Sequence, residues 1–478
     1  MTSQIPVRQI DPATDASNNK KSATVDLYAS RKKIYVKEVK GLFQRIRTVS
    51  LWALMGMYFL FCWISIDGQP LIYFNLPARE FNLFSATFYP QDFILLSGML
   101  IIAAFGLFFV TTLFGRVWCG YTCPQTVWTF IFMWVEERIE GSRNRRIKLD
   151  KSPNSAEKIT KKSLKHSAWL LIAFATGLTF VGYFYPVREL STDLFTLQAN
   201  GWAYFWTGFF TLATYLNAGW MREQVCLYMC PYARFQSVMY DSDTRTVAYD
   251  PVRGEPRGGR KKSASKEELG LGDCIDCGMC VQVCPTGIDI RDGLQYECIG
   301  CALCIDACDE VMDKMNYPRG LIRYATENEL EGRPSKLLRP RTFGYGAALA
   351  FMVGALIFTL LTRVPAELDV ERDRGALYRM NGKGLIENSY TVKLINMSEV
   401  PQTFELSVTG MNTISIVDNQ PVTVASGEDR ILPTVVEVSP EAVEQSNTAI
   451  TFRAESTTDE SLVLETESRF VGPNRPGR

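Results

Sequence analysis

Five stretches of the chain are almost continuously apolar, and polar or charged segments separate them. They cover residues 48–66, 93–114, 168–185, 202–220 and 342–361. Each is close to the length of about 20 residues that an α-helix needs to cross the hydrocarbon layer of a membrane. The pattern therefore predicts five transmembrane helices. The alternative is five buried helices in a soluble protein.

A different pattern begins at about residue 375. Short runs alternate between apolar and polar residues, and turn residues separate one run from the next. The runs are 390–395, 403–408, 420–425, 431–438, 449–454 and 461–466. Because alternation with a period of two is typical of strands with one buried face, we expect an all-β, immunoglobulin-like sandwich over residues 375–478.

Lysine and arginine are distributed unevenly, although the formal net charge of the chain is zero. Residues 1–47 contain ten of them and residues 115–167 contain eleven, whereas 67–92 and 186–201 contain one each. Basic loops stay in the cytoplasm, so this alternation indicates topology rather than a nucleic-acid-binding surface, and no nucleic-acid partner is expected. The first 47 residues lack an apolar core, so we expect no cleaved signal peptide.

These patterns predict a multi-pass α-helical protein of the bacterial inner membrane, in contact with lipid. Residues 1–47 form a cytoplasmic segment, residues 48–241 form a four-helix membrane region, and residues 342–361 form the fifth transmembrane helix. An odd number of crossings places the carboxy-terminal sandwich in the periplasm and residues 242–341 in the cytoplasm.

Eight of the thirteen cysteines form two tandem motifs within residues 242–341. CIDCGMCVQVCP begins at Cys274 and CIGCALCIDAC begins at Cys298, and both have the spacing C-x2-C-x2-C-x3-C. This spacing resembles that of bacterial two-cluster ferredoxins, in which the last cysteine of each motif binds the other cluster. The resemblance implies one 4Fe-4S cluster on Cys274, Cys277, Cys280 and Cys308. It implies a second cluster on Cys298, Cys301, Cys304 and Cys284.

Zinc or free thiols are the alternatives for these eight cysteines. Structural zinc takes four ligands, usually as two separated pairs, so two tandem quartets fit cubane clusters better. The reducing cytoplasm disfavours disulfides at this position. The chain has one histidine, His166, which excludes bis-histidine haem ligation. The Gly-, Lys- and Arg-rich segment 253–272 is expected to be a flexible linker.

Four further cysteines form a second, duplicated system. WCGYTCP contains Cys119 and Cys123, and VCLYMCP contains Cys226 and Cys230. Both are C-x3-C-P, both follow an apolar stretch, and they lie 107 positions apart, which indicates an internal repeat. Residues four apart share a helix face, so the two sulfurs of a pair can share a ligand on a proline-distorted helix. Four such thiolates can bind Cu(I), hold another iron–sulfur centre or cycle through disulfides, and the alternative is packing at helix ends.

The parts in this order resemble the CcoG/FixG/Rdx family of cytochrome c oxidase accessory proteins, which are membrane polyferredoxins. The resemblance rests on the two cysteine systems, the Ig-like tail and residues 30–45, 75–93, 118–128, 226–241 and 316–324. It implies a role in assembling cbb3-type oxidase by reducing Cu(II) to Cu(I) for the copper centre. It also implies three kinds of partner, namely copper ion, a cytoplasmic electron donor, and copper chaperones or oxidase assembly factors.

Two other functions are compatible with the same residues. The first is a membrane electron conduit that exchanges electrons with a quinone pool or another redox enzyme. The second is a non-catalytic assembly scaffold whose clusters are structural. Cys62 stands alone in the first apolar stretch and is expected to pack as a small hydrophobic residue.

Overall fold

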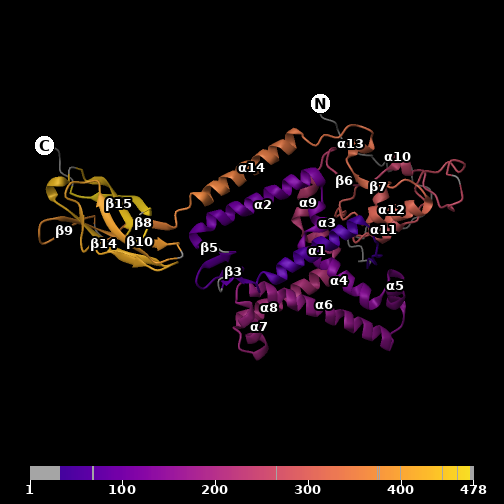
Figure 1. Ribbon diagram of the computed structural model, residues 1–478, viewed down its shortest axis with the longest axis horizontal. Helices are drawn as coiled ribbons and strands as arrows, with labels where there is room; N and C mark the ends of the chain where they lie inside the picture. Colours follow the sequence, from indigo (N-terminus) through magenta and orange to yellow (C-terminus); the bar gives the residue numbers. More distant parts are fainter. Residues whose placement is uncertain are drawn as a thin grey trace, which may run out of the picture.

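The computed structural model describes residues 33–473, apart from residues 67, 68, 85, 265, 374, 376, 399, 444 and 460. The first 32 residues of the amino-terminal segment 1–47 and the last five residues of the sandwich segment lie outside this part. Along the longest axis, a β-sandwich, a group of helices and a cysteine-rich domain follow one another (Figure 1).

Each of the five apolar stretches forms a helix. These helices are α1 (Leu42–Leu60), α2 (Phe93–Phe114), α6 (Ala156–Gly182), α8 (Gly201–Thr214) and α14 (Pro340–Leu361). Within the described residues, three of them are long and apolar enough to cross a membrane, namely α2, α6 and α14. α1 carries Arg45 and Arg47 in its first two turns, and α8 stays α-helical for only 14 residues. The backbone after α8 widens into a π-helix, η2 (Tyr215–Met221).

The helices α2 and α14 lie side by side, away from the other helices (Figure 1). Within their described residues, α2 buries only Thr111 and Thr112, and α14 buries only Thr342. Soluble proteins rarely expose apolar surfaces of this extent, so the two helices are not the buried helices of a soluble fold. Their exposed faces suit contact with lipid.

The remaining helices form a bundle around α4 (Pro124–Glu140), a helix that the hydrophobic pattern did not indicate. Val127 and Ile131 of α4 pack against α1, and Phe132 stacks on Trp169 of α6. The short helices α5 (Arg143–Lys151) and α7 (Val187–Thr196) connect the longer ones. Cys62 is buried between α1 and α6, where it packs as expected.

Small antiparallel sheets connect α1 to α2 on the side of the sandwich. They consist of β1 (Ser65–Ile66), β2 (Gln69–Pro70), β3 (Ile72–Asn75), β4 (Glu80–Leu83) and β5 (Ala86–Phe88), followed by the 3-10 turn η1 (Pro90–Asp92). Asp92 pairs with Arg363 at the end of α14 at 2.6 Å, and Tyr89 contacts Gly427 of the sandwich. These contacts fix the sandwich to the ends of α2 and α14.

The cysteine-rich domain follows η3 (Val225–Met229, π-helix) and α9 (Pro231–Val238). Its elements are β6 (Thr246–Tyr249), α10 (Pro251–Gly254), α11 (Met279–Gln282), η4 (Ile290–Asp292), α12 (Leu303–Met315), β7 (Ile322–Ala325) and α13 (Glu327–Leu330). Strands β6 and β7 pair antiparallel and close the domain. Asp306 of α12 accepts the backbone N–H groups of Phe43 and Gln44, and thereby caps the amino end of α1.

The segment 253–272 is not the free linker that its composition suggested. It folds back on the first cysteine motif, where Gly258 N donates to the carbonyl oxygen of Cys274 at 3.2 Å. The Arg260 guanidinium donates to Gly272 O at 2.6 Å, so basic side chains satisfy carbonyl groups of the turn. Composition alone did not reveal these contacts, because they depend on a motif that follows in the chain.

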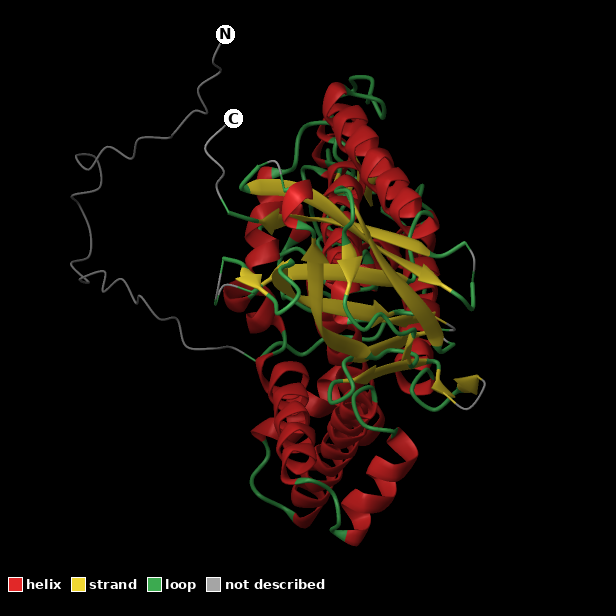
Figure 2. Cartoon of the chain, turned by 90° about the vertical axis from the view of Figure 1, so that its left-hand side faces the viewer, coloured by secondary structure: helices red, strands yellow, loops and turns green. Residues whose placement is uncertain are grey.

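The carboxy-terminal domain is the expected Ig-like sandwich of two antiparallel sheets (Figure 2). One sheet has the order β12 (Ser415–Ile416), β14 (Asp429–Val438), β10 (Ile386–Asn396), β8 (Ala366–Arg372), with β9 (Arg379–Met380) beside β10. The other has the order β13 (Val422–Val424), β11 (Gln402–Thr409), β15 (Asn447–Ser456), β16 (Val463–Val471). The turn η5 (Pro440–Ala442) links β14 to β15. The sandwich begins before the expected residue 375, because its first strand, β8, covers Ala366–Arg372. The sequence pattern does not separate this strand from the apolar helix α14, which ends only a few residues earlier.

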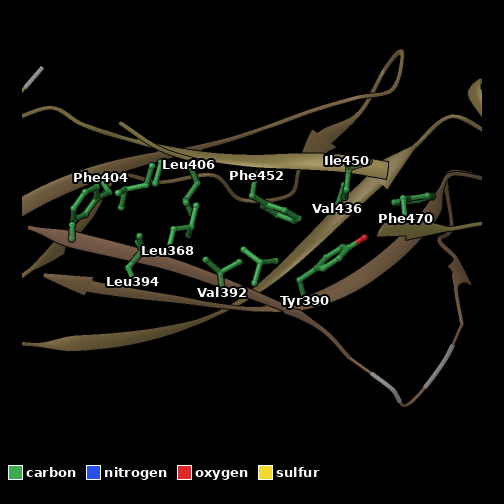
Figure 3. Close-up of a cluster of buried hydrophobic side chains, with 14 of the residues drawn as sticks. Leu368, Tyr390, Val392, Leu394, Phe404, Leu406, Val436, Ile450, Phe452 and Phe470 are labelled. Atoms are coloured by element: carbon green, nitrogen blue, oxygen red, sulfur yellow. The ribbon is translucent and has the colours of Figure 1, made fainter. Parts of the chain in front are cut away.

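The core of the sandwich comes from alternate residues of facing strands. Tyr390, Val392 and Leu394 of β10 point toward Phe404 and Phe452 of the opposite sheet (Figure 3). All five side chains are fully buried, and the rings of Tyr390 and Phe452 meet edge to face at 5.0 Å.

Candidate metal centres

The eight cysteines of the tandem motifs line two cavities in the cysteine-rich domain. One cavity is lined by Cys274, Cys277, Cys280 and Cys308. The other is lined by Cys284, Cys298, Cys301 and Cys304, and Cys280 also lines it. The structure therefore brings together both quartets implied by the resemblance to ferredoxins, including the exchange of the last cysteine between motifs.

The loops around the two cavities have the same backbone conformation. Asp276 and Gly278 in the first motif have φ values of 53° and 63°, and Gly300 and Ala302 in the second have 65° and 59°. In the described part of the chain, no three His, Cys, Asp or Glu side chains converge closely enough to hold a single metal ion. A zinc ion needs its sulfurs at about 2.3 Å, whereas a cubane spreads its thiolates over separate irons. The cavities thus fit 4Fe-4S clusters.

Seven of these eight cysteines are buried or partly buried. Burial raises the pKa of Cys298 and Cys308 to about 12 and that of Cys280 to about 11. These metal-free thiols are therefore protonated at neutral pH, and iron binding must displace their protons. Cys277 differs, because it is the one exposed thiol among the thirteen cysteines, all of which lie in the described part.

The two C-x3-C-P motifs do not form continuous helices. Helix α3 (Val117–Tyr121) ends before Cys123, and α4 begins at Pro124. In the second motif, η3 ends before Cys230, and α9 begins at Pro231. The expectation that each cysteine pair shares one helix face is therefore wrong. Proline lacks an N–H group and pushes the preceding residue into an extended conformation, so it starts a new helix and leaves the cysteine before it at the cap.

The four thiols of the two motifs nevertheless lie in one neighbourhood. Burial, followed by the neighbouring Cys123, raises the pKa of Cys119 to about 12. Cys226 and Cys230 act on the Cys119 thiol in the same direction, and Cys123 and Cys230 do so on Cys226. Since such charge effects fade with distance, the cysteines of the two repeats are neighbours, but within the described residues no three of them converge on one point. We call Cys119, Cys123, Cys226 and Cys230 the membrane thiol site.

Polar contacts that the sequence did not reveal join the two repeats. The side chain of Gln125, beside Pro124, donates to the carbonyl oxygens of Asn217 at 2.9 Å and Arg222 at 3.2 Å. Asn217 O also accepts a hydrogen bond from the backbone N–H of Arg222 at 2.8 Å, at the end of the π-helical turn η2, so this carbonyl oxygen has two donors. Arg222 in turn donates to Glu136 of α4 at 2.8 Å.

Glu136 is the centre of a buried ion network. Its carboxylate is fully buried, and besides Arg222 it has Arg146 and Lys33 at 3.5 Å. Burial by itself would raise the pKa of Glu136, but Arg222, Lys33 and Lys165 outweigh burial and hold it at about 2. The network locks α4, α6 and the loop before Cys226 together. No local sequence motif predicts this ion network, because its members come from four distant segments of the chain.

Comparison with known proteins agrees with this architecture. Residues 221–327 match the family model of a 4Fe-4S dicluster domain, residues 96–139 match that of a 4Fe-4S binding domain, and residues 356–473 match that of the IG-like fold at the C-terminus of FixG. Nitrogen fixation protein FixG of Rhizobium meliloti is 39% identical over 86% of this chain and 87% of its own length. The chain belongs to the FixG/Rdx family.

Two further members of the FixG/Rdx family come from Cereibacter sphaeroides. Protein RdxB is 42% identical over 84% of this chain and 87% of its own length, and protein RdxA is 43% identical over 80% and 84%. The resemblance seen in the sequence is thus confirmed. This FixG/Rdx protein is a membrane-associated redox protein that carries 4Fe-4S clusters.

Proposed function

We propose that this FixG/Rdx protein reduces Cu(II) to Cu(I) during assembly of cbb3-type cytochrome c oxidase. The observation that carries the proposal is that thiols from two repeats are neighbours beside the iron–sulfur domain. Soft thiolates favour Cu(I) over harder ions, so the membrane thiol site suits the reduced product. Each turnover takes one electron from a cytoplasmic donor and converts one Cu(II) ion to Cu(I), which copper chaperones or assembly factors then accept.

In this proposal the two cysteine systems have separate roles. Cys274, Cys277, Cys280 and Cys308 hold one cluster, and Cys284, Cys298, Cys301 and Cys304 hold the other. When bound, these clusters supply one-electron transfer. Cys119, Cys123, Cys226 and Cys230 supply thiolates for copper, and a pair of them is enough to hold Cu(I).

We further propose that the chain crosses the bacterial inner membrane five times. The basic segments and the cluster domain then face the cytoplasm, and the sandwich faces the periplasm. The apolar exposed faces of α2 and α14 support this arrangement, as does the separation of the two domains along the long axis (Figure 1).

A double variant, Cys226→Ser with Cys230→Ser, tests the proposed function. We expect loss of Cu(II) reduction, measured anaerobically with a Cu(I)-specific chelator, while the EPR signals of both reduced clusters persist. Cys62→Ala is the matched control, because Cys62 is a buried cysteine outside the site, and its rate should equal that of the wild type. A double variant that still reduces Cu(II) at the wild-type rate rejects the proposal.

One observation favours a second candidate, in which the membrane thiol site holds a third iron–sulfur centre of an electron conduit. Residues 96–139, which include Cys119 and Cys123, match the model of a 4Fe-4S binding domain. Iron analysis of protein purified without oxygen separates the candidates. An iron content equal to two clusters, together with tight copper binding, favours cupric reduction. An iron content equal to three clusters, together with quinol oxidation, favours the electron conduit.

A further inference from the structure

The first C-x3-C-P motif and the second cluster motif touch through two glycines. A Cβ atom at Gly120 would lie 2.8 Å from the carbonyl oxygen of Gly300 and 3.0 Å from the Cα of Cys301. A Cβ atom at Gly300 would lie 3.0 Å from the carbonyl oxygen of Arg116. The two backbones are therefore in direct contact, and a side chain at either glycine must push them apart.

A comparison of the two cluster motifs shows why residue 300 is glycine. Asp276 occupies the corresponding position in the first motif and has φ 53°, against 65° for Gly300. A residue with a side chain thus adopts this backbone conformation in the same protein. The side chain of Asp276 is exposed, whereas Gly300 is buried against Arg116. The close approach to the membrane motif, rather than the local turn, explains the glycine.

Arg116 holds the contact in place. Arg116 is 7% exposed, and its guanidinium donates to the carbonyl oxygens of Tyr296 and Cys298, the latter at 3.0 Å. The same guanidinium donates to the carbonyl oxygen of Ala233 in α9 at 2.7 Å, so it joins the second cluster motif to the second C-x3-C-P repeat. Cys119 itself packs in one hydrophobic cluster with Cys301.

Met279 and Val283 of the first cluster motif share the hydrophobic cluster of Cys119, but Gly300 of the second motif makes the backbone contact with the first C-x3-C-P motif. In the first cluster motif, Cys277 is exposed, and the segment 253–272 covers Cys274. We propose that the ferredoxin domain and the membrane thiol site exchange electrons across the Gly120–Gly300 contact, with Arg116 as its positioning residue. The second cluster motif, Cys298–Cys304, is then the output side, and the first motif, with exposed Cys277, is the input side for the cytoplasmic donor.

This inference rests on the proposed function for its acceptor. Each transfer across the contact moves one electron, reduces one Cu(II) ion to Cu(I) and oxidises the iron–sulfur domain by one electron. No bond to carbon or hydrogen forms or breaks. The residues Gly120, Gly300 and Arg116 set the approach of the two motifs and take no part in the redox change.

The test compares Gly300→Ala and Gly120→Ala with Asp276→Ala in the full-length protein, purified in detergent without oxygen. Asp276→Ala is the matched control at the corresponding position of the input motif. EPR of the dithionite-reduced protein first establishes that both clusters are assembled. Stopped-flow absorbance then measures cluster reoxidation by Cu(II), and mass spectrometry measures how fast a maleimide labels Cys119. If Gly300→Ala does not assemble its clusters, Gly120→Ala carries the test, because it lies outside the cluster domain.

We expect reoxidation to be several-fold slower in both glycine variants and unchanged in Asp276→Ala, with faster labelling of Cys119 in the glycine variants only. Equal reoxidation in all three variants overturns the inference. If Cu(II) does not oxidise the clusters of even the wild-type protein, the proposed function fails. The rate at which the maleimide labels Cys119 then tests the Gly120–Gly300 contact by itself. Equal labelling of Cys119 in all three variants then overturns it.

Discussion

Glu136 is a single residue whose charge has consequences for the whole bundle. Its buried carboxylate is paired with Arg222, Arg146 and Lys33, and removal of one partner from a buried pair costs about 3–5 kcal/mol. Glu136→Gln should therefore lower the melting temperature at pH 7 clearly and loosen the loop before Cys226. Glu157→Gln is the matched control, because Glu157 forms an exposed pair with Lys161 that contributes little.

The effect of Glu136→Gln should also depend on pH. The pKa of Glu136 is about 2 in the folded protein and near its ordinary value of 4.5 in the unfolded chain. The carboxylate therefore stabilises the fold fully above pH 4.5, and this contribution is lost as the pH falls toward 2. The difference in melting temperature between wild type and Glu136→Gln should shrink between pH 6 and pH 3. A difference that stays constant over this range contradicts the assigned role of the ion network.

At the scale of elements, Pro124 and Pro231 separate the helices that carry the membrane thiol site. Pro124→Ala restores a backbone N–H group and allows α3 and α4 to join, which rotates Cys123 away from the cap position. We expect Pro124→Ala and Pro231→Ala to lose most Cu(II) reduction while both cluster EPR signals persist. Pro153→Ala, in the exposed turn after α5, is the control and should keep the wild-type rate. Wild-type rates in both site variants contradict the need for the helix break.

The sequence predicts elements whose signal is local. The ferredoxin-like cysteine motifs implied both quartets of Cys274–Cys308, and the hydrophobic patterns located the five apolar helices and six of the nine described strands of the sandwich. It does not predict features that depend on distant partners. The cap of α1 comes from Asp306, far along the chain, and the side chain of Gln125 donates to the carbonyl oxygen of Asn217 in the π-helix η2. The sequence also does not predict that the helix breaks completely at Pro124, because the C-x3-C spacing suits one continuous helix as well.

At the scale of the whole molecule, the arrangement of the domains predicts a topology. Helix α2 has 22 residues and α14 has 22, which at 1.5 Å per residue gives about 33 Å, close to the hydrocarbon thickness of a bilayer. The cluster domain lies at one end of this helix pair and the sandwich lies at the other (Figure 1). The two domains should therefore face opposite sides of the membrane.

Cysteine labelling in cells tests this topology. Leu294 in the cluster domain and Ile431 in the sandwich have similar exposure, 53% and 60%, so Leu294→Cys and Ile431→Cys are matched probes. A membrane-impermeant maleimide should label Ile431→Cys in spheroplasts and label Leu294→Cys only after the membrane is opened. The unmodified protein gives the background from Cys277. The reverse pattern rejects the proposed orientation, whereas labelling of both probes from one side requires that α14, the one proposed span between them, does not cross. The reverse pattern is expected if α1 or α8, the two helices with the weakest spanning character, does not cross while α14 does, because both helices precede the two probes in the chain.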